Sequence, residues 1–191
     1  MTALILQNFS VSSFDPCVLL SKKEKVIVCI YIDDLLLFSS HQDKLESVCL
    51  LLHEEFEMTE SPITYILGIS VTFDNSGIRL SQQAYITKIL ERFQMSDSSP
   101  VTTPLEPHTT LYKGTPEDII DNLFYYQSII GSLIYAVIGT RSDLAYTVML
   151  LSQFSSCPNS THLIAAKRVL KYFKGTQDWY LSFLSVGQSV L

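Results

Sequence analysis

The stretch that decides the fold of this chain runs from Val26 to Ser39 and reads VIVCIYIDDLLLFS. Residues 26–32 are rich in β-branched side chains, and residues 35–38 are apolar again, as expected for two buried strands. Two acidic residues, Asp33 and Asp34, stand between the two runs, at or beside a tight turn. The stretch therefore predicts a β-hairpin that carries a pair of carboxylates near its tip.

Asp33 and Asp34 are candidate metal ligands. Adjacent carboxylates between buried strands repel each other and bury poorly, and a divalent cation would resolve that conflict. Mg²⁺ suits such a pair, because it takes one or two carboxylates, keeps several waters and accepts substrate phosphates. The alternative is an ordinary acidic turn, since Asp is favoured in turns. The apolar strands on both sides favour the metal site, because they would hold the turn rigidly.

A helix and a second hairpin are expected after this stretch. Ser40 and Asp43 read as a capping box at the start of the helix. Its apolar face would contain Leu45, Val48, Cys49, Leu52 and Phe56. Residues 66–73 then alternate in polarity, and the turn at residues 74–77 returns the chain through residues 78–80, which predicts a half-buried hairpin.

The rest of the chain reads as helical. A first apolar stripe consists of Tyr85, Ile86, Ile89, Leu90 and Phe93. Four prolines mark a long linker over residues 96–121. Three further helices are expected over residues 123–138, from a capping box at Thr140 and Asp143 to residue 154, and over residues 160–174 with Gly175 as the stop.

Composition limits the class of protein. The 191 residues suit one large domain or two small ones. The chain has 47% apolar and 17% charged residues, so it is unusually hydrophobic for a globular protein. Such a chain has either an unusually large core or apolar surface that expects a partner. The apolar runs are too short or too interrupted for a membrane span, and no signal peptide is visible. Four cysteines without metal spacing indicate an intracellular protein, cytoplasmic or nuclear.

Several segments, taken together, resemble the reverse transcriptases of copia-type retrotransposons. VIVCIYIDDLLLFS resembles their YxDD hairpin, and the preceding FDPCVLL resembles the segment before it. Further matches follow in the family's order and extend the resemblance over roughly residues 14–183: YILGISV, IRLSQQAYITKILERFQM, TPL, YQSIIGSLIYAVIGTRSDLAY and HLIAAKRVLKYFKGT. The family has Pro where this chain has Ser142, and either residue suits a first helical turn.

The resemblance implies an α+β fold. Residues 1–80 would form the second half of a polymerase palm, with antiparallel strands, a helix and the YIDD hairpin. Residues 81–191 would form a helical region like a thumb or connection, with the proline-containing linker 96–121. The family reaction is RNA-directed DNA polymerisation on an RNA or DNA template-primer with dNTPs, assisted by Mg²⁺ or Mn²⁺. Asp33 and Asp34 would be the catalytic metal ligands, and Tyr31 and Ile32 would line the substrate site.

Two further groups of residues have roles implied by the resemblance. Leu67, Gly68 and Ile69 resemble the primer grip, although the same residues also fit a plain structural hairpin. Lys167, Lys171 and Lys174 share one helix face and could contact template or primer phosphates. The alternative for the lysines is a solvated face whose cations complement the helix dipole. The net charge of −6 argues against strong nucleic-acid binding, unless phosphate contacts are spread over a larger polymerase.

The chain departs from the family in what it lacks. The family carries another metal-binding Asp in a motif resembling DVxxAFL on an earlier palm strand, and only Asp15 precedes the hairpin here. We also expect this chain to act without the fingers, which the family carries upstream, and without the RNase H domain, which it carries downstream. The first expectation is therefore a truncated fragment, inactive alone. The alternatives are a polymerase half that works in trans with a missing upstream palm and fingers segment, and a non-catalytic remnant that binds nucleic acid or another partner.

Overall fold

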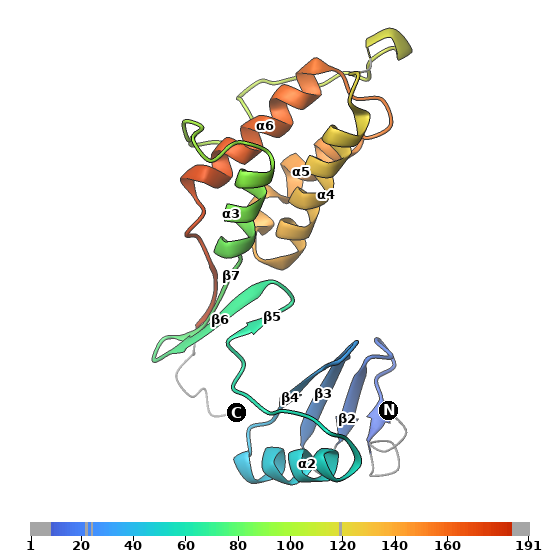
Figure 1. Cartoon of the computed structure of the whole chain (residues 1–191), viewed down its shortest axis with the longest axis vertical. Coiled ribbons are helices and arrows are strands. Elements are labelled where there is room, and N and C mark those ends of the chain that lie inside the picture. The colour runs from blue at the N-terminus through green and yellow to red at the C-terminus, as the bar shows by residue number, and fades with distance from the viewer. Residues whose placement is uncertain (1–8, 22, 24, 119, 185–191) are drawn as a thin grey trace. The chain divides into compact units, whose positions relative to one another are not determined.

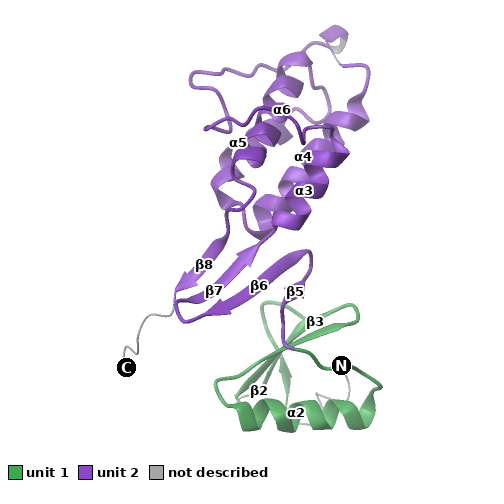
Figure 2. Ribbon diagram, turned by 60° about the vertical axis from the view of Figure 1, so that its left-hand side comes forward, with its two compact units in different colours: residues 1–61 green, residues 62–191 purple. Residues whose placement is uncertain are grey.

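A computed structural model describes residues 9–21, 23, 25–118 and 120–184. The fold is α+β, as expected, with two four-stranded antiparallel sheets and five α-helices in the described residues. The chain divides into two compact units, Met1–Ser61 and Pro62–Leu191 (Figure 2). The ends of the two expected domains, residues 1–8 and 185–191, lie outside the described residues.

The first unit is a sheet with one helix against it (Figure 1). The strands follow one another in chain order across the sheet, and the predicted hairpin is present. A short first strand was not expected, because residues 1–25 show no clear polarity pattern. The elements are β1 (Ser10–Val11), β2 (Val18–Ser21), β3 (Val26–Tyr31), β4 (Asp34–Phe38) and α2 (Gln42–Glu55).

The sheet of the first unit buries one face only. Its core consists of Phe9, Leu19, Val26, Val28, Val48 and Leu52. Ile27 and Phe38, which pair across β3 and β4, point to the other face and are exposed. The prediction that both hairpin strands are buried is therefore wrong. Successive side chains of a strand point to opposite faces, and the core of this unit forms on one of them.

The start of α2 also differs from the expected capping box of Ser40 and Asp43. The helix begins after His41, which makes no side-chain cap. Instead, the Ser39 hydroxyl accepts a hydrogen bond from the backbone N–H of His41 at 3.1 Å and donates one to the Lys25 carbonyl at 2.9 Å. Ser39 thus ties the helix start to the β2–β3 turn, a contact that requires tertiary structure.

The second unit has its own sheet, in the order β5-β6-β7-β8. Residues 66–73, which alternate in polarity, do not form one strand. Leu67 and Gly68 have φ of 49° and 75° and make a two-residue turn within this stretch. The expected turn at residues 74–77 is confirmed. The strands are β5 (Tyr65–Ile66), β6 (Ile69–Asp74), β7 (Gly77–Ser81) and β8 (Leu181–Leu184).

The boundary between the compact units falls after residue 61 rather than at residue 80. β8, which was not predicted, pairs with β7 and brings the C-terminal segment back to the hairpin. The Tyr135 hydroxyl also donates a hydrogen bond to the Leu67 carbonyl. Pairings between segments about 100 residues apart therefore group residues 62–81 with the helices that follow them.

The helices of the second unit lie where the apolar stripes predict them (Figure 1). The stripe on the first helix is buried at Ile86, Ile89, Leu90 and Phe93. The linker contains one short 3₁₀ helix, η1 (Pro116–Asp118), and its apolar residues pack on the core. The helices are α3 (Gln83–Arg92), α4 (Leu123–Gly139), α5 (Ala145–Ser152) and α6 (Ser160–Gly175). None of the described helices is long and apolar enough to span a bilayer.

Two predicted helix ends are wrong in detail. Thr140 and Asp143 form no capping box: the Thr140 hydroxyl donates to Gln82 Oε1, and a 3₁₀ turn, η2 (Ser142–Leu144), precedes α5. Gly175 is the last residue of α6 rather than a left-handed stop, since the C-cap is Thr176 at φ −134°. A Cβ at position 175 would lie 3.1 Å from Pro100 Cβ, so close packing explains this glycine.

Candidate functional site

The β3–β4 hairpin presents the acidic pair. Five cross-strand pairs run from Ile27–Phe38 to Tyr31–Asp34, which leaves Ile32 and Asp33 as a two-residue loop. Asp33 therefore stands at the tip, and Asp34 opens β4 opposite Tyr31. This is the tight turn between two strands that the sequence predicts.

The loop has an unusual backbone. Ile32 has φ of 52° and is 81% exposed. Two-residue hairpin loops favour positive φ, and Gly, Asn or Asp usually occupies such a position. A β-branched residue there costs on the order of 1–3 kcal/mol, and such strain clusters at functional sites. The strand ladder behind the loop holds Ile32 in this conformation.

Both carboxylates of the pair are open to a ligand. Asp33 and Asp34 are exposed, and neither forms an ion pair or accepts a side-chain hydrogen bond within the part of the chain that the structure describes. Over the same residues, no group of three or more Asp, Glu, His or Cys could hold a metal ion. The chain thus offers two oxygen ligands, which fit Mg²⁺ only if water, phosphates or a further carboxylate complete the shell.

The predicted substrate-lining residues lie beside the acidic pair. Tyr31 and Ile32 are both exposed, Tyr31 at the end of β3 and Ile32 in the loop. Tyr31 is opposite Asp34. Successive side chains of a strand point to opposite faces of the sheet, and Val28, three residues before Tyr31, is buried under α2. Tyr31 therefore lies on the face that α2 does not cover. A ligand at the hairpin tip would therefore meet an aromatic ring and the carboxylates together.

Leu67, Gly68 and Ile69 belong to the second unit, at the β5–β6 turn. The Tyr135 hydroxyl holds this turn by its hydrogen bond to the Leu67 carbonyl. A Cβ at position 68 would lie 2.7 Å from Tyr135 Oη, and φ there is positive, so glycine is required for two reasons. The primer-grip role stays a prediction.

The three lysines of the predicted phosphate face lie on α6 and are partly exposed. Lys167 Nζ lies 5.7 Å from the centre of the Tyr125 ring. The neighbouring Arg168 lies 3.9 Å from a Glu106 carboxylate oxygen and donates to Thr103 Oγ1 at 3.1 Å. Lys171 and Lys174 have no ion-pair partner among the described residues. The phosphate contacts of this face remain a prediction.

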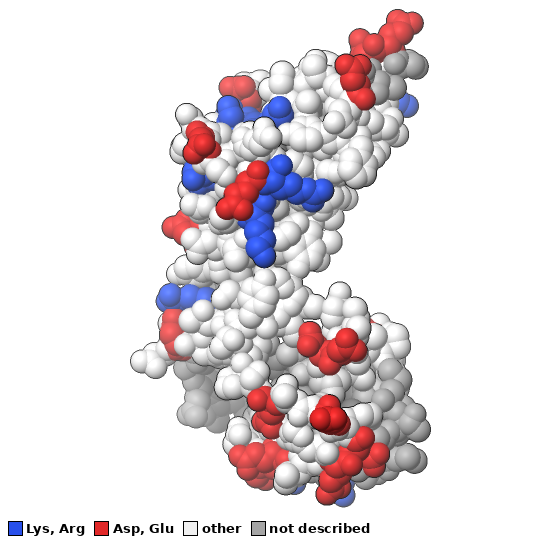
Figure 3. Space-filling view, in the orientation of Figure 1, with Lys and Arg blue, Asp and Glu red and all other residues white. Residues whose placement is uncertain are grey.

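Charge is distributed unevenly between the two units. Residues 1–61 contain ten acidic and four basic side chains, and residues 62–191 contain nine of each. The net charge of −6 therefore resides in the unit that carries the acidic hairpin. The face drawn in Figure 3 shows Lys and Arg side chains gathered over the helices of the second unit. The overall charge thus does not exclude phosphate contacts there.

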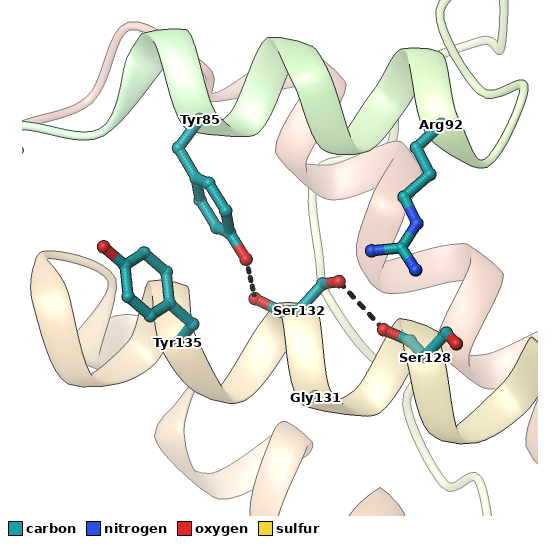
Figure 4. A pocket seen from close by; sticks show the side chains of 6 residues that line it. All are labelled: Tyr85, Arg92, Ser128, Gly131, Ser132 and Tyr135. Atoms are coloured by element: carbon teal, nitrogen blue, oxygen red, sulfur yellow. Dashed lines mark hydrogen bonds between the residues drawn. The ribbon is translucent and has the colours of Figure 1, made fainter. Parts of the chain in front are cut away.

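Sequence reasoning missed an open pocket between α3 and α4. Figure 4 shows its lining residues, which are Tyr85, Arg92, Ser128, Gly131, Ser132 and Tyr135. One signal was available in the sequence, a glycine in the middle of a predicted helix. The pairing of α3 with α4, which places Arg92 opposite that glycine, could not be read from the sequence.

Comparison with known proteins identifies the family. Residues 5–107, just over half of the chain, match the family described as "Reverse transcriptase (RNA-dependent DNA polymerase)". The chain is 32% identical to the retrovirus-related Pol polyprotein from transposon TNT 1-94 of Nicotiana tabacum, over 93% of the chain and 14% of that protein. It is 35% identical to the Pol polyprotein from transposon RE1 of Arabidopsis thaliana, over 95% of the chain and 12% of that protein.

A shorter relative matches as well. An uncharacterized mitochondrial protein of Arabidopsis thaliana is 34% identical over 77% of the chain and 60% of its own length. No solved structure matches the chain. The chain spans about an eighth of the length of the Pol polyproteins, and the matches confirm the resemblance seen in its motifs. The chain therefore belongs to the reverse transcriptase family, in the copia-type group of retrotransposon Pol proteins.

Proposed function

We propose that the β3–β4 hairpin supplies two metal ligands, Asp33 and Asp34, to a polymerase site for RNA-directed DNA synthesis. The substrates would be a template-primer and a dNTP. The observation that carries the proposal is a pair of exposed, unpaired carboxylates at the hairpin tip, Asp33 in the strained two-residue loop and Asp34 at the start of β4, in a chain of this family. Divalent ions in such sites activate the attacking hydroxyl and stabilise the leaving pyrophosphate.

The chain's own residues position the reactants in this proposal. The ladder of β3 and β4 fixes the loop, so the two carboxylates are placed before substrate arrives. The Tyr31 ring, next to Asp34, offers a flat apolar surface to a base or sugar at the primer end. The Ile32 side chain, which is almost fully exposed, would meet the substrate directly.

The site needs at least one more acidic ligand. The described residues place only Asp33 and Asp34 at the hairpin. The family resemblance assigns a further Asp to another palm strand, and β4 has a free edge in the described sheet at which a strand could pair. We therefore expect polymerisation to depend on a segment that carries such an Asp, in the same polypeptide or in trans.

Metal binding by this chain tests the site directly. With a dissociation constant on the order of 1 mM, Mg²⁺ at about 10 mM should raise the free energy of unfolding by roughly 1.4 kcal/mol. Chemical denaturation with and without Mg²⁺ measures this gain. The double variant Asp33→Asn, Asp34→Asn should lose it. A control with Glu54→Gln and Glu55→Gln removes the same charge from α2 and should keep it; an equal loss in both variants would mean that the effect is general screening.

Primer extension provides the second readout. The chain alone should extend no primer on an RNA template, with Mg²⁺ or Mn²⁺. Adding a polypeptide that contains the DVxxAFL-like palm strand and the fingers should restore extension, and Asp33→Asn should abolish it. Extension by the unaided chain that survives Asp33→Asn would place the reaction elsewhere.

A further inference from the structure

The linker between α3 and α4 follows one side of α6. A Cβ at Gly175, the last residue of α6, would lie 3.1 Å from Pro100 Cβ. Two turns earlier on the same helix, Arg168 Nη2 donates a hydrogen bond to Thr103 Oγ1 at 3.1 Å. Lys171 is three residues after Arg168 and four before Gly175, so it lies on the same side of the helix, between the two contacts.

Arg168 uses only part of its hydrogen-bonding capacity toward this stretch of the linker. The Nε–H and the Nη2 group of a guanidinium lie on the same side and form a two-pronged donor that fits two oxygens at once. Nη2 is bonded to Thr103, whereas Nε is buried and has no hydrogen-bond partner among the described residues. Nη1 lies 3.9 Å from a Glu106 carboxylate oxygen, which is too far for a hydrogen bond. Arg168 therefore meets one oxygen where its geometry accepts two.

The Thr103 side chain is the point at which a second oxygen can be added. Thr103 is exposed, lies outside the helices and strands, and is followed by Pro104. Protein kinases of the proline-directed class modify a Ser or Thr hydroxyl in this sequence context. A phosphate on Oγ1 would bring three acceptor oxygens and nearly two negative charges. Two of these oxygens fit the prongs of Arg168, and the partly exposed Lys171 adds a positive charge beside them.

We propose that Thr103 is a phosphorylation site whose phosphate binds Arg168 and fixes the linker on α6. Thr103 Oγ1 would attack the γ-phosphorus of ATP in a proline-directed kinase. The bond from that phosphorus to the bridging oxygen breaks, ADP leaves, and the hydroxyl proton passes to the base of the kinase. The Glu106 carboxylate would be repelled by the phosphate, but its side chain is 71% exposed and can turn into solvent. The proposal concerns the second unit alone and does not depend on the metal site of the β3–β4 hairpin.

A second Thr-Pro sequence in the same linker provides a matched control. Thr115 is exposed and precedes Pro116. Its hydroxyl donates to an Asp118 carboxylate oxygen at 2.8 Å, and its backbone N–H donates to the same oxygen at 3.0 Å. A phosphate on Thr115 would therefore meet a carboxylate instead of a guanidinium. Phosphorylation should stabilise the linker at position 103 and destabilise it at position 115.

Phosphothreonine incorporated during translation at position 103 or position 115 of the full chain tests the proposal. Titration followed by ³¹P NMR measures the second pKa of each phosphate, which is ordinarily about 6. Pairing with Arg168 favours the dianion, so the pKa at position 103 should fall below this value, and the Asp118 charge should raise it at position 115. Calorimetry should show a melting temperature of the second unit raised by about 4 °C at position 103 and lowered at position 115.

Variants of Arg168 show whether the guanidinium causes these effects. Arg168→Gln should return the phosphate pKa to about 6 and remove the gain in melting temperature. Arg168→Lys keeps the charge without the two-pronged geometry and should retain only part of both effects. Because lysine is the milder change, it maintains the comparison where glutamine weakens the fold. Effects at position 103 that survive both substitutions would overturn the proposal, as would equal pKa values at positions 103 and 115.

Access of a kinase to Thr103 is tested on the folded, unmodified chain. Incubation with ATP and a mitogen-activated protein kinase, followed by mass spectrometry of the digested chain, should locate a phosphate on Thr103. Absence of phosphate at this position would overturn the proposal. A peptide of residues 97–109, treated in the same way, shows whether the fold or the local sequence prevents the reaction. A phosphate on Thr103 that lowers the melting temperature would contradict the predicted bond to Arg168.

Discussion

Among the described residues, Ile32 is the β-branched residue that adopts a positive φ. Its φ of 52° lies in the left-handed region, and its side chain is 81% exposed. Ile32→Gly should therefore raise the free energy of unfolding of the first unit by about 1 kcal/mol, as relief of strain exceeds the added freedom of the unfolded chain. Urea denaturation measures this change.

The control for this prediction is Ile32→Ala. Alanine removes the exposed side chain and keeps the unfavourable positive φ, so this variant should raise the free energy of unfolding little or not at all. Equal stability of the glycine and alanine variants would show that the backbone at position 32 stores no strain. Substrate binding through the isoleucine side chain is a separate property, measured in the complete polymerase.

We expect His162 to make the stability of the second unit depend on pH. The side chain is fully buried and stacks on Phe154 at 3.9 Å, and its Nδ1 accepts a hydrogen bond from the backbone N–H of Asn159. Burial lowers the pKa of His162 below its ordinary value of 6.5, although the Tyr112 backbone carbonyl partly opposes this. The unfolded chain therefore binds a proton more readily than the folded one. The contribution to stability is complete above about pH 6.5 and is lost as the pH falls toward the lowered pKa.

The free energy of unfolding should accordingly fall between about pH 7.5 and about pH 5.5. His162→Gln provides the control, because glutamine at this helix position can still accept the hydrogen bond of a capping box and does not titrate. The variant should be less stable overall, since the ring stacking is lost, and should show a smaller pH dependence. An unchanged pH dependence would assign it to other groups.

At the scale of elements, a buried arginine joins the α4–α5 connection to the end of α6. Arg141 is 1% exposed and makes two hydrogen bonds to the Asp143 carboxylate, at 3.0 and 2.9 Å. It also donates to the carbonyl and hydroxyl oxygens of Thr176. The Tyr172 hydroxyl donates to the same carboxylate. Through these hydrogen bonds the segment TRSDL joins the α4–α5 connection to the end of α6.

Arg141→Met should destabilise the second unit by about 3 kcal/mol, at the low end for a broken buried pair, because Asp143 is partly exposed and can be hydrated. Chemical denaturation measures the loss. Addition of Asp143→Asn should recover part of it. The matched control is Arg79→Met, which breaks the exposed pair with Asp74 and should cost far less stability than Arg141→Met. Similar losses in the two variants would show that burial of the pair does not matter.

At the scale of the whole molecule, part of the high content of apolar side chains lies on the surface and not in the core. The sheet of the first unit has an open apolar face that includes Ile27, Cys29, Leu36 and Phe38. β4 has a neighbour on one side only within the described sheet. An apolar edge strand is a template for pairing with another chain. We therefore expect the chain to self-associate at tens of micromolar.

Leu36→Lys should reduce this self-association, since a lysine on the edge strand opposes pairing. Light scattering after size-exclusion chromatography measures the mass. Leu50→Lys makes the same substitution on the exposed surface of α2 and should leave the mass unchanged. A monodisperse monomer of the unsubstituted chain would show that the open face and edge do not drive association.

The sequence by itself determined the elements that local pattern controls. The β3–β4 hairpin, its acidic tip and the helices α2 to α6 follow from polarity period, because side-chain spacing decides which residues share a face. The order of the motifs also determined the family. Residues 26–39 alone were enough to place Asp33 and Asp34 together, since the two are adjacent in the chain.

Only the tertiary structure decided the features that join distant segments. β8 pairs with β7 across about 100 residues, Tyr135 holds the Leu67 turn, and Arg92 faces Gly131 across α3 and α4. No local pattern encodes such pairs. The predicted helix caps were wrong for the same reason. The Ser39 hydroxyl, before α2, bonds to the Lys25 carbonyl, and the Thr140 hydroxyl, after α4, bonds to Gln82. A local capping rule considers only bonds within the first turn of a helix and therefore misses such distant partners.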